Sequence, residues 1–164
     1  MPTSSTGNRA RAVAGVTLME MMVVLVIIAL IVGISLPSTL AGLDNIRLSS
    51  GARSVAAFMN SAANRAERRQ QAIELFVFVK ESAVSMRSPE PGFLKKLNLP
   101  QGIIVRAVWP AAPEDTDEPR VFLFLPGGVP PRIGIELANK RGARRIVRLN
   151  PITGVAEIEQ PPSS

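Results

Sequence analysis

The stretch Gly15-Val-Thr-Leu-Met-Glu20, followed by the uncharged run from Met21 to Leu36 and then by Pro37, decides the fold of this chain. Counted from Val16, the apolar segment has about 21 residues and measures roughly 30 Å as a helix. This length matches the hydrocarbon core of a bilayer, so the sequence predicts a transmembrane helix at 16–37. Glu20 lies inside the segment, where an ionised carboxylate is costly, and is therefore a functional candidate.

The residues before the segment, 1–15, form a polar leader that carries Arg9 and Arg11 and no acid. A basic leader of this kind predicts an N-terminus in the cytoplasm. A secretory signal peptide would be cleaved after its apolar region, next to small residues, and Leu36-Pro37-Ser38 does not suit that cleavage. A plain signal anchor remains open on the residues alone.

The motif from Gly15 to Glu20, together with its apolar run, resembles the class III signal of type IV pilins and type II secretion pseudopilins. The resemblance implies that a prepilin peptidase cuts between Gly15 and Val16 and methylates the new N-terminus at Val16. It also implies a single-pass protein of the bacterial inner membrane with its C-terminal domain in the periplasm. The residues to which it assigns a role in assembly are Thr17, Leu18, Glu20 and Pro37.

Beyond Pro37, which would ordinarily end or kink a helix, the resemblance implies that the helix continues. The sequence supports this with an amphipathic pattern over 38–71, in which apolar residues recur at spacings of three and four or their sums. We expect this stripe to pack against the rest of the domain. Its members are Leu43, Ile46, Val55, Phe58, Met59, Ala62 and Ala66.

From Ile73 the period of the pattern changes to two, which indicates strands. The expected strands cover 73–80, 83–87, 102–109, 120–125, 133–138, 143–149 and 155–158, with a loop at 89–100 and a central position for the apolar strand 120–125. The sequence thus predicts an α+β fold, in which a long N-terminal helix packs on an antiparallel β-sheet domain as in pilins. The predicted segments are a leader at 1–15, a transmembrane helix at 16–37, an amphipathic continuation at 38–71, a β domain at 72–160 and a tail at 161–164.

The composition argues against an enzyme. The chain has no cysteine and no histidine, which removes thiol chemistry and the commonest general base and metal ligand. The acidic cluster Glu114, Asp115, Asp117 and Glu118 offers oxygen ligands for Ca²⁺, but no distal glutamate follows it as a Ca²⁺ loop requires. We therefore expect no catalytic residue, no metal and no cofactor.

Five basic residues near the C-terminus are the second candidate site: Lys140, Arg141, Arg144, Arg145 and Arg148. On a strand, Arg144 and Arg148 share one face and Arg145 takes the other. Such residues suit either DNA phosphates or contacts between subunits, and the sequence leaves both open. No aromatic residue lies among them in the sequence, so base stacking is not expected.

The C-terminal part carries a second resemblance. Phe122-Leu-Phe-Leu-Pro-Gly127 and Asn150-Pro-Ile-Thr-Gly154 are similar to motifs of the H-type minor pseudopilin (GspH) and of the FimT-type minor pilin. The implied function is a structural subunit at or near the tip of the pseudopilus of a type II secretion system. The implied partners are prepilin peptidase, other major and minor pseudopilins and the inner membrane. The alternative is a FimT-type pilin that binds DNA during natural transformation.

Overall fold

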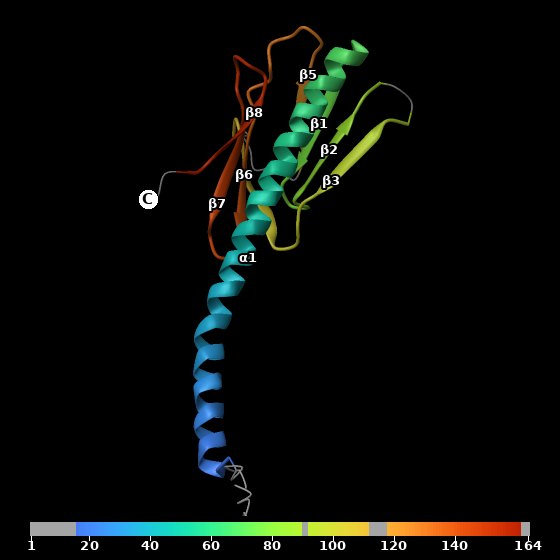
Figure 1. The fold of residues 1–164 in the computed structure, drawn as a ribbon. Helices are drawn as coiled ribbons and strands as arrows, with labels where there is room; N and C mark the ends of the chain where they lie inside the picture. Colours follow the sequence, from blue (N-terminus) through green and yellow to red (C-terminus); the bar gives the residue numbers. More distant parts are fainter. Residues whose placement is uncertain (1–15, 90–91, 112–117, 162–164) are drawn as a thin grey trace, which may run out of the picture. The chain divides into compact units, whose positions relative to one another are not determined.

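The computed structural model of the chain describes residues 16–89, 92–111 and 118–161, and within 34–41 it describes the backbone alone. The described part contains one helix followed by eight strands (Figure 1). These elements are α1 (Leu18–Arg69), β1 (Ile73–Phe78), β2 (Ala83–Arg87), β3 (Leu94–Asn98), β4 (Ile103–Trp109), β5 (Arg120–Phe124), β6 (Gly134–Asn139), β7 (Arg144–Leu149) and β8 (Ala156–Glu159). Helix α1 includes Pro37, so the helix continues past this proline as expected.

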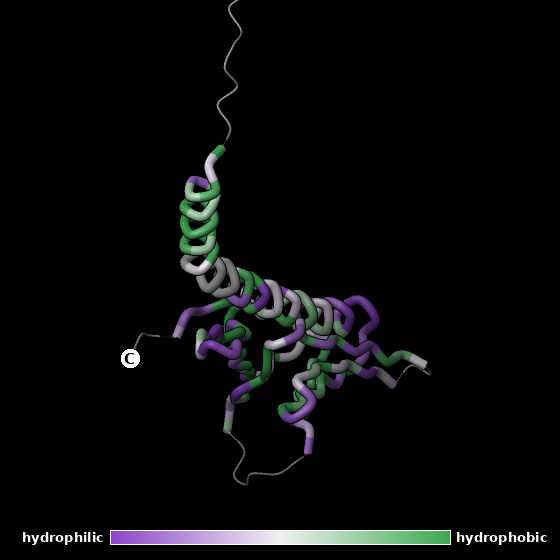
Figure 2. Tube along the Cα trace, turned by 90° about the horizontal axis from the view of Figure 1, so that it is seen from below, coloured by the Kyte–Doolittle hydropathy of each residue, from purple (hydrophilic) through white to green (hydrophobic). Residues whose placement is uncertain are grey.

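The chain divides into two compact units, the first of which ends at Thr39. In its described part, the turns of α1 from Leu18 to Gly33 are exposed on every side. Leu18 is 81% exposed, and large apolar side chains remain exposed as far as Val32. Figure 2 shows the hydrophobic colour around these turns. A helix that is apolar all round normally lies inside a larger apolar environment.

No helix in the described part of the chain has the length and apolar character needed to cross a membrane. The predicted transmembrane segment at 16–37 is therefore wrong, and so is the predicted location as a single-pass inner-membrane protein with a periplasmic C-terminal domain. The apolar segment was counted from Val16 to Leu36 in the sequence. The helix begins at Leu18, two residues after the start of the predicted segment, and carries the acidic residue Glu20 in its first turn.

The second unit covers 40–164 and holds the remainder of α1 and all the described strands. The strands form two four-stranded antiparallel sheets, with the orders β3-β2-β1-β5 (sheet A) and β4-β6-β7-β8 (sheet B). This arrangement is compatible with the predicted α+β class. The prediction of one sheet was too simple, because the strands after β3 pair in two separate sets.

In this unit the helix lies along the strands of both sheets (Figure 1), and one stripe of its residues belongs to the buried core. The stripe consists of Leu48, Ala52, Val55, Met59, Ala62 and Ala66, at alternating spacings of four and three. The predicted stripe was correct from Val55 onward. Its first two members were wrong: Ile46 is 64% exposed and Leu43 is also exposed. The helix contacts a hairpin, described below, through polar side chains instead: those of the partly buried Asp44 and the exposed Asn45.

The two sheets complete the core with alternate residues of their strands. Sheet A contributes Ile73, Leu75 and Val77 of β1 with Phe122 and Phe124 of β5. Sheet B contributes residues of β4 and β7 together with β6, which is buried along its whole length. Each large side chain removed from water stabilises the fold by about 1.5–3 kcal/mol. The helix and both sheets therefore share one core.

Two expectations about strands were wrong. The segment 89–100 contains β3, which pairs with β2 and was missed because Leu94-Lys-Lys-Leu-Asn98 does not alternate. Strand β5 lies at the edge of sheet A instead of at its centre. Its residues Val121 and Leu123 point away from the core and are exposed, so the apolar sequence of β5 does not reflect burial on two faces.

Candidate functional sites

The N-terminus of α1 is capped by Thr17. The backbone N–H of Glu20 donates to the Thr17 hydroxyl at 3.2 Å, and the N–H groups of Glu20 and Met21 lie 3.1 and 3.2 Å from the Thr17 carbonyl oxygen. Thr17 and Glu20 have the spacing of a capping box, so this cap could have been predicted from the sequence. The Glu20 carboxylate also lies in the first turn, where the helix dipole favours a negative charge.

The other residues of the pilin-like motif are in part outside the described chain. Gly15 precedes the first described residue, and the side chain of Pro37 lies in the segment described by its backbone alone. Val16 and Leu18 are exposed. The structure thus places the proposed new N-terminus, Val16, directly before the residue that caps the helix.

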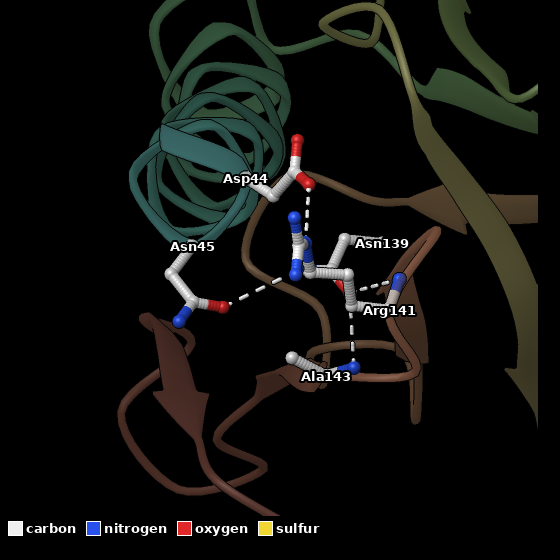
Figure 3. A network of polar contacts seen from close by, with 5 residues as sticks. All are labelled: Asp44, Asn45, Asn139, Arg141 and Ala143. Carbon is white, nitrogen blue, oxygen red and sulfur yellow. Dashed lines mark hydrogen bonds and ion pairs between the residues drawn. The ribbon is translucent and has the colours of Figure 1, made fainter. Parts of the chain in front are cut away.

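Arg141 holds the β6–β7 hairpin to the helix (Figure 3). Its guanidinium donates to Asp44 on α1 at 3.1 Å. Asn139 makes a second link by donating to Asn45 at 3.3 Å, while its side-chain oxygen accepts the N–H groups of Arg141 and Ala143, each at 3.0 Å. The turn closes through Gly142, whose positive φ of 82° suits glycine. Arg141 therefore already has a structural role in the described chain.

Arg144 is engaged by a buried carboxylate. Glu136 of β6 lies between Arg144, at 3.4 Å, and Arg106 of β4, at 3.8 Å. Arg144 and Arg148 occupy the same face of β7, as alternation predicts. The opposite face carries Val147 and Leu149, which are buried in the core. The Arg144 guanidinium thus compensates the charge of Glu136.

The remaining three cations lie in different surroundings. Lys140 is exposed in the turn, and the Arg145 guanidinium donates to the carbonyl oxygen of Arg144 at 3.1 Å. Arg148 lies across Gly134 from Trp109, since Trp109 pairs with Gly134 and Gly134 pairs with Arg148. The five cations therefore do not form one patch. An aromatic residue, Trp109, does lie beside one of them, Arg148, and the linear sequence did not reveal this.

The two turns that carry the C-terminal motifs lie together with α1. They line a pocket of about 530 Å³ with helix residues Asn60, Asn64 and Glu67. The Glu67 carboxylate accepts the N–H of Gly127 at 2.9 Å, which fixes one turn, and the Asn150 side chain accepts the N–H of Ile152 at 2.9 Å in the other. Two apolar residues protrude from this region: Val129 is 85% exposed and Ile152 is 91% exposed.

Within the ranges that the structure describes, no group of three or more acidic residues is placed to hold a metal ion. The acidic residues Glu114, Asp115 and Asp117 lie outside those ranges, so the expectation that they bind no Ca²⁺ stays a prediction. The absence of catalytic residues and cofactors stays a prediction. Comparison of the chain with protein-family models, with curated proteins and with solved structures gave no match.

Proposed function

We propose that this chain is an H-type minor pseudopilin, a structural subunit at or near the tip of the pseudopilus of a type II secretion system. In this proposal a prepilin peptidase cuts between Gly15 and Val16, and the mature chain acts by assembly with other major and minor pseudopilins. The observation that carries the proposal is the exposed apolar surface of α1 between Leu18 and Gly33.

The exposed apolar surface between Leu18 and Gly33 is suited to contact another molecule. Exposed apolar area on this scale marks an interaction site in most proteins. Packing against the same segment of neighbouring subunits would contribute about 25 cal/mol for each Å² removed from water. The motif Gly15-Val-Thr-Leu-Met-Glu20 directly before the apolar turns is the feature that pilin-like subunits share, and it selects a filament over other apolar environments.

Glu20 acquires a specific role in the filament. Cleavage after Gly15 creates an α-amine at Val16, one residue before the Thr17 cap, and a positive charge there opposes the helix dipole. The Glu20 carboxylate offsets that charge. Among closely packed apolar helices, each of these charges is costly unless it is paired, so we infer an ion pair between Glu20 and the Val16 amine of a neighbouring subunit.

The β domain supplies lateral contacts in this proposal. Val129 and Ile152 protrude beside the pocket lined by the two C-terminal turns, and apolar side chains so exposed suit a contact with the next subunit. The alternative function, DNA binding by a FimT-type pilin, stays a prediction. Arg141 and Arg144 are paired with Asp44 and Glu136, which leaves fewer of the five cations for phosphates and favours assembly.

A crosslinking experiment tests the proposal, because the chain has no cysteine of its own. A single cysteine at Val26, labelled with a photoactivatable maleimide, should crosslink on irradiation to neighbouring pilin-like subunits, which mass spectrometry identifies. A cysteine at the exposed Glu81, in the β1–β2 turn, is the matched control. If Val26→Cys gives no more crosslinks to pilin-like proteins than Glu81→Cys, the proposed function is wrong.

The substitution Glu20→Gln separates the two roles of Glu20. Glutamine serves in a capping box as glutamate does, so a purely local role predicts unchanged crosslinking through Val26→Cys. The proposed ion pair predicts that Glu20→Gln loses most of the crosslinks while the helix content, measured by circular dichroism, stays the same. Glu159→Gln, which removes an exposed carboxylate from β8, controls for the loss of one negative charge.

A further inference from the structure

Trp109 and Arg148 lie on either side of Gly134, which places no side chain between them. Gly134 of β6 pairs with Trp109 of β4 on one side and with Arg148 of β7 on the other. A Cβ atom on Gly134 would lie 3.2 Å from Cε3 of the indole and 3.9 Å from Nε of Arg148. Glycine at this position therefore lets an aromatic face and a guanidinium share one site.

The site is a pocket of about 450 Å³ on the outer face of sheet B. Trp109, Pro110 and Pro151 supply apolar walls, and Arg132 and Arg148 supply two guanidiniums. Both arginines are exposed, and neither forms an ion pair with any residue that the structure describes. The pocket thus combines an apolar lining with two guanidiniums that are not bound in ion pairs within the described residues.

We propose that this pocket binds an acidic segment of a partner protein. A glutamate or aspartate carboxylate would bond to Arg148 and Arg132, and an adjacent apolar residue or proline would pack on Trp109. Charge complementarity selects the carboxylate, and arginine recognises that group by paired hydrogen bonds. Tryptophan and arginine are also the residues most often found to dominate binding at protein interfaces.

A nucleic acid fits this face less well than an acidic protein segment. Glu157 of β8 lies opposite Arg148 in the next strand, and Glu159 is two residues further along the same strand. These carboxylates would repel a continuous phosphate backbone, whereas one carboxylate side chain needs room only at the two arginines. The proposal concerns sheet B alone and does not depend on how the N-terminal turns of α1 are used.

Binding can be followed directly by tryptophan fluorescence, because Trp109 is the one tryptophan of the chain. The probe is the acetylated peptide Leu-Glu-Pro-Leu-Glu-amide, titrated into the full-length chain and followed by tryptophan fluorescence and by calorimetry. The matched probe replaces both glutamates of the peptide by glutamine. We expect saturable binding of the acidic peptide and binding of the neutral peptide that is weaker by about tenfold or more, since charge-assisted hydrogen bonds are lost.

Variants locate the binding. Arg148→Gln should weaken binding of the acidic peptide by about tenfold, and Arg132→Gln should weaken it in the same direction. Lys95→Gln, which removes an exposed cation from β3 in the other sheet, should leave the affinity unchanged. Circular dichroism confirms that each variant is folded.

Any of four results would overturn the proposal. The first is equal affinity for the acidic and the neutral peptide. The second is unchanged binding of the acidic peptide to Arg148→Gln. The third is the absence of both a fluorescence and a calorimetric response. Tighter binding of single-stranded oligodeoxythymidylate than of the acidic peptide, lost in Arg148→Gln, would also overturn it and would assign the pocket to nucleic acid.

Discussion

The side-chain oxygen of Asn60, on α1, accepts a hydrogen bond from the backbone N–H of Ala156, the first residue of β8, at 2.8 Å. Strand β8 lies at the edge of sheet B and pairs with β7 alone among the described strands. Asn60 therefore ties this edge directly to the helix, across 96 residues of sequence.

Asn60→Ala should lower the free energy of unfolding by about 1–3 kcal/mol, because the N–H of Ala156 loses its acceptor in a partly buried position. Asn60→Asp keeps an acceptor oxygen and should stay close to the wild type. Urea unfolding followed by circular dichroism measures both. An Asn60→Ala midpoint equal to that of the wild type would show that water replaces the amide at no cost.

The β6–β7 hairpin offers a comparison of two anchors. Asn139 is buried and makes three hydrogen bonds, so Asn139→Ala should cost about 1–3 kcal/mol. The Arg141 side chain is 45% exposed, and its ion pair with Asp44 should contribute less than about 1 kcal/mol. Urea unfolding of Asn139→Ala and Arg141→Ala should show this order, and the reverse order would contradict the assignment of the main anchor to Asn139.

Truncation tests the packing of α1 on the sheets. A chain that begins at Leu40 keeps the whole buried stripe and should fold, because the second compact unit begins there. A chain that begins after Met59 loses Val55 and Met59 and uncovers the apolar inner faces of both sheets, so it should be insoluble. Yield in the soluble fraction and the dispersion of amide resonances distinguish the two. Equal behaviour of both truncations would refute the packing of the stripe.

Processing is tested at Gly15. The pilin-like motif implies that the peptidase requires glycine at the cleavage site, so Gly15→Leu should remain uncut in cells. Mass spectrometry of the wild-type chain should find Val16 as the first residue, with a methyl group on its α-amine. Any other mature N-terminus would remove the basis for the pairing proposed for Glu20.

The five C-terminal cations decide between the two candidate functions. If they are assembly contacts, the wild-type chain should bind duplex DNA weakly, and the double variant Arg144→Gln/Arg148→Gln should impair assembly or secretion. If they bind DNA, about three to four phosphate contacts would give a slope of about −3 for log affinity against log salt. Tight binding with such a slope, lost in the double variant while secretion stays intact, would favour DNA uptake.

The sequence predicted the elements that depend on local patterns. Strand alternation located β1 and β2, and the stripe from Val55 onward followed from spacings of three and four. The pattern could not show that Asp44 and Asn45 make the tertiary contacts of this part of α1, because their partners are residues of a hairpin about 95 positions later. Strand β3 was missed because, among the described strands, it pairs with β2 alone, and an edge position leaves little pattern in five residues.

The candidate sites were predicted unevenly for the same reason. The motif at 15–20 was found from the sequence, although the capping role of Thr17 was overlooked. The cluster of five cations was identified by composition, but the ion pairs of Arg141 and Arg144 depend on tertiary contacts. The approach of Trp109 to Arg148 depends on pairing across three strands, and nothing in the linear sequence connects them.

The edge position of β5 has a consequence for the unfolding chain. The other edge strands are guarded by charge: β3 by Lys95 and Lys96, β8 by Glu157 and Glu159, and β4 by Arg106 at its bulge. Strand β5 carries no charge between Val121 and Phe124. Natural sheets avoid such edges because they recruit strands from other chains. Heat-induced aggregation of this protein should therefore nucleate at Val121-Phe-Leu-Phe124, with Arg120 and Pro126 as the gatekeepers that limit it.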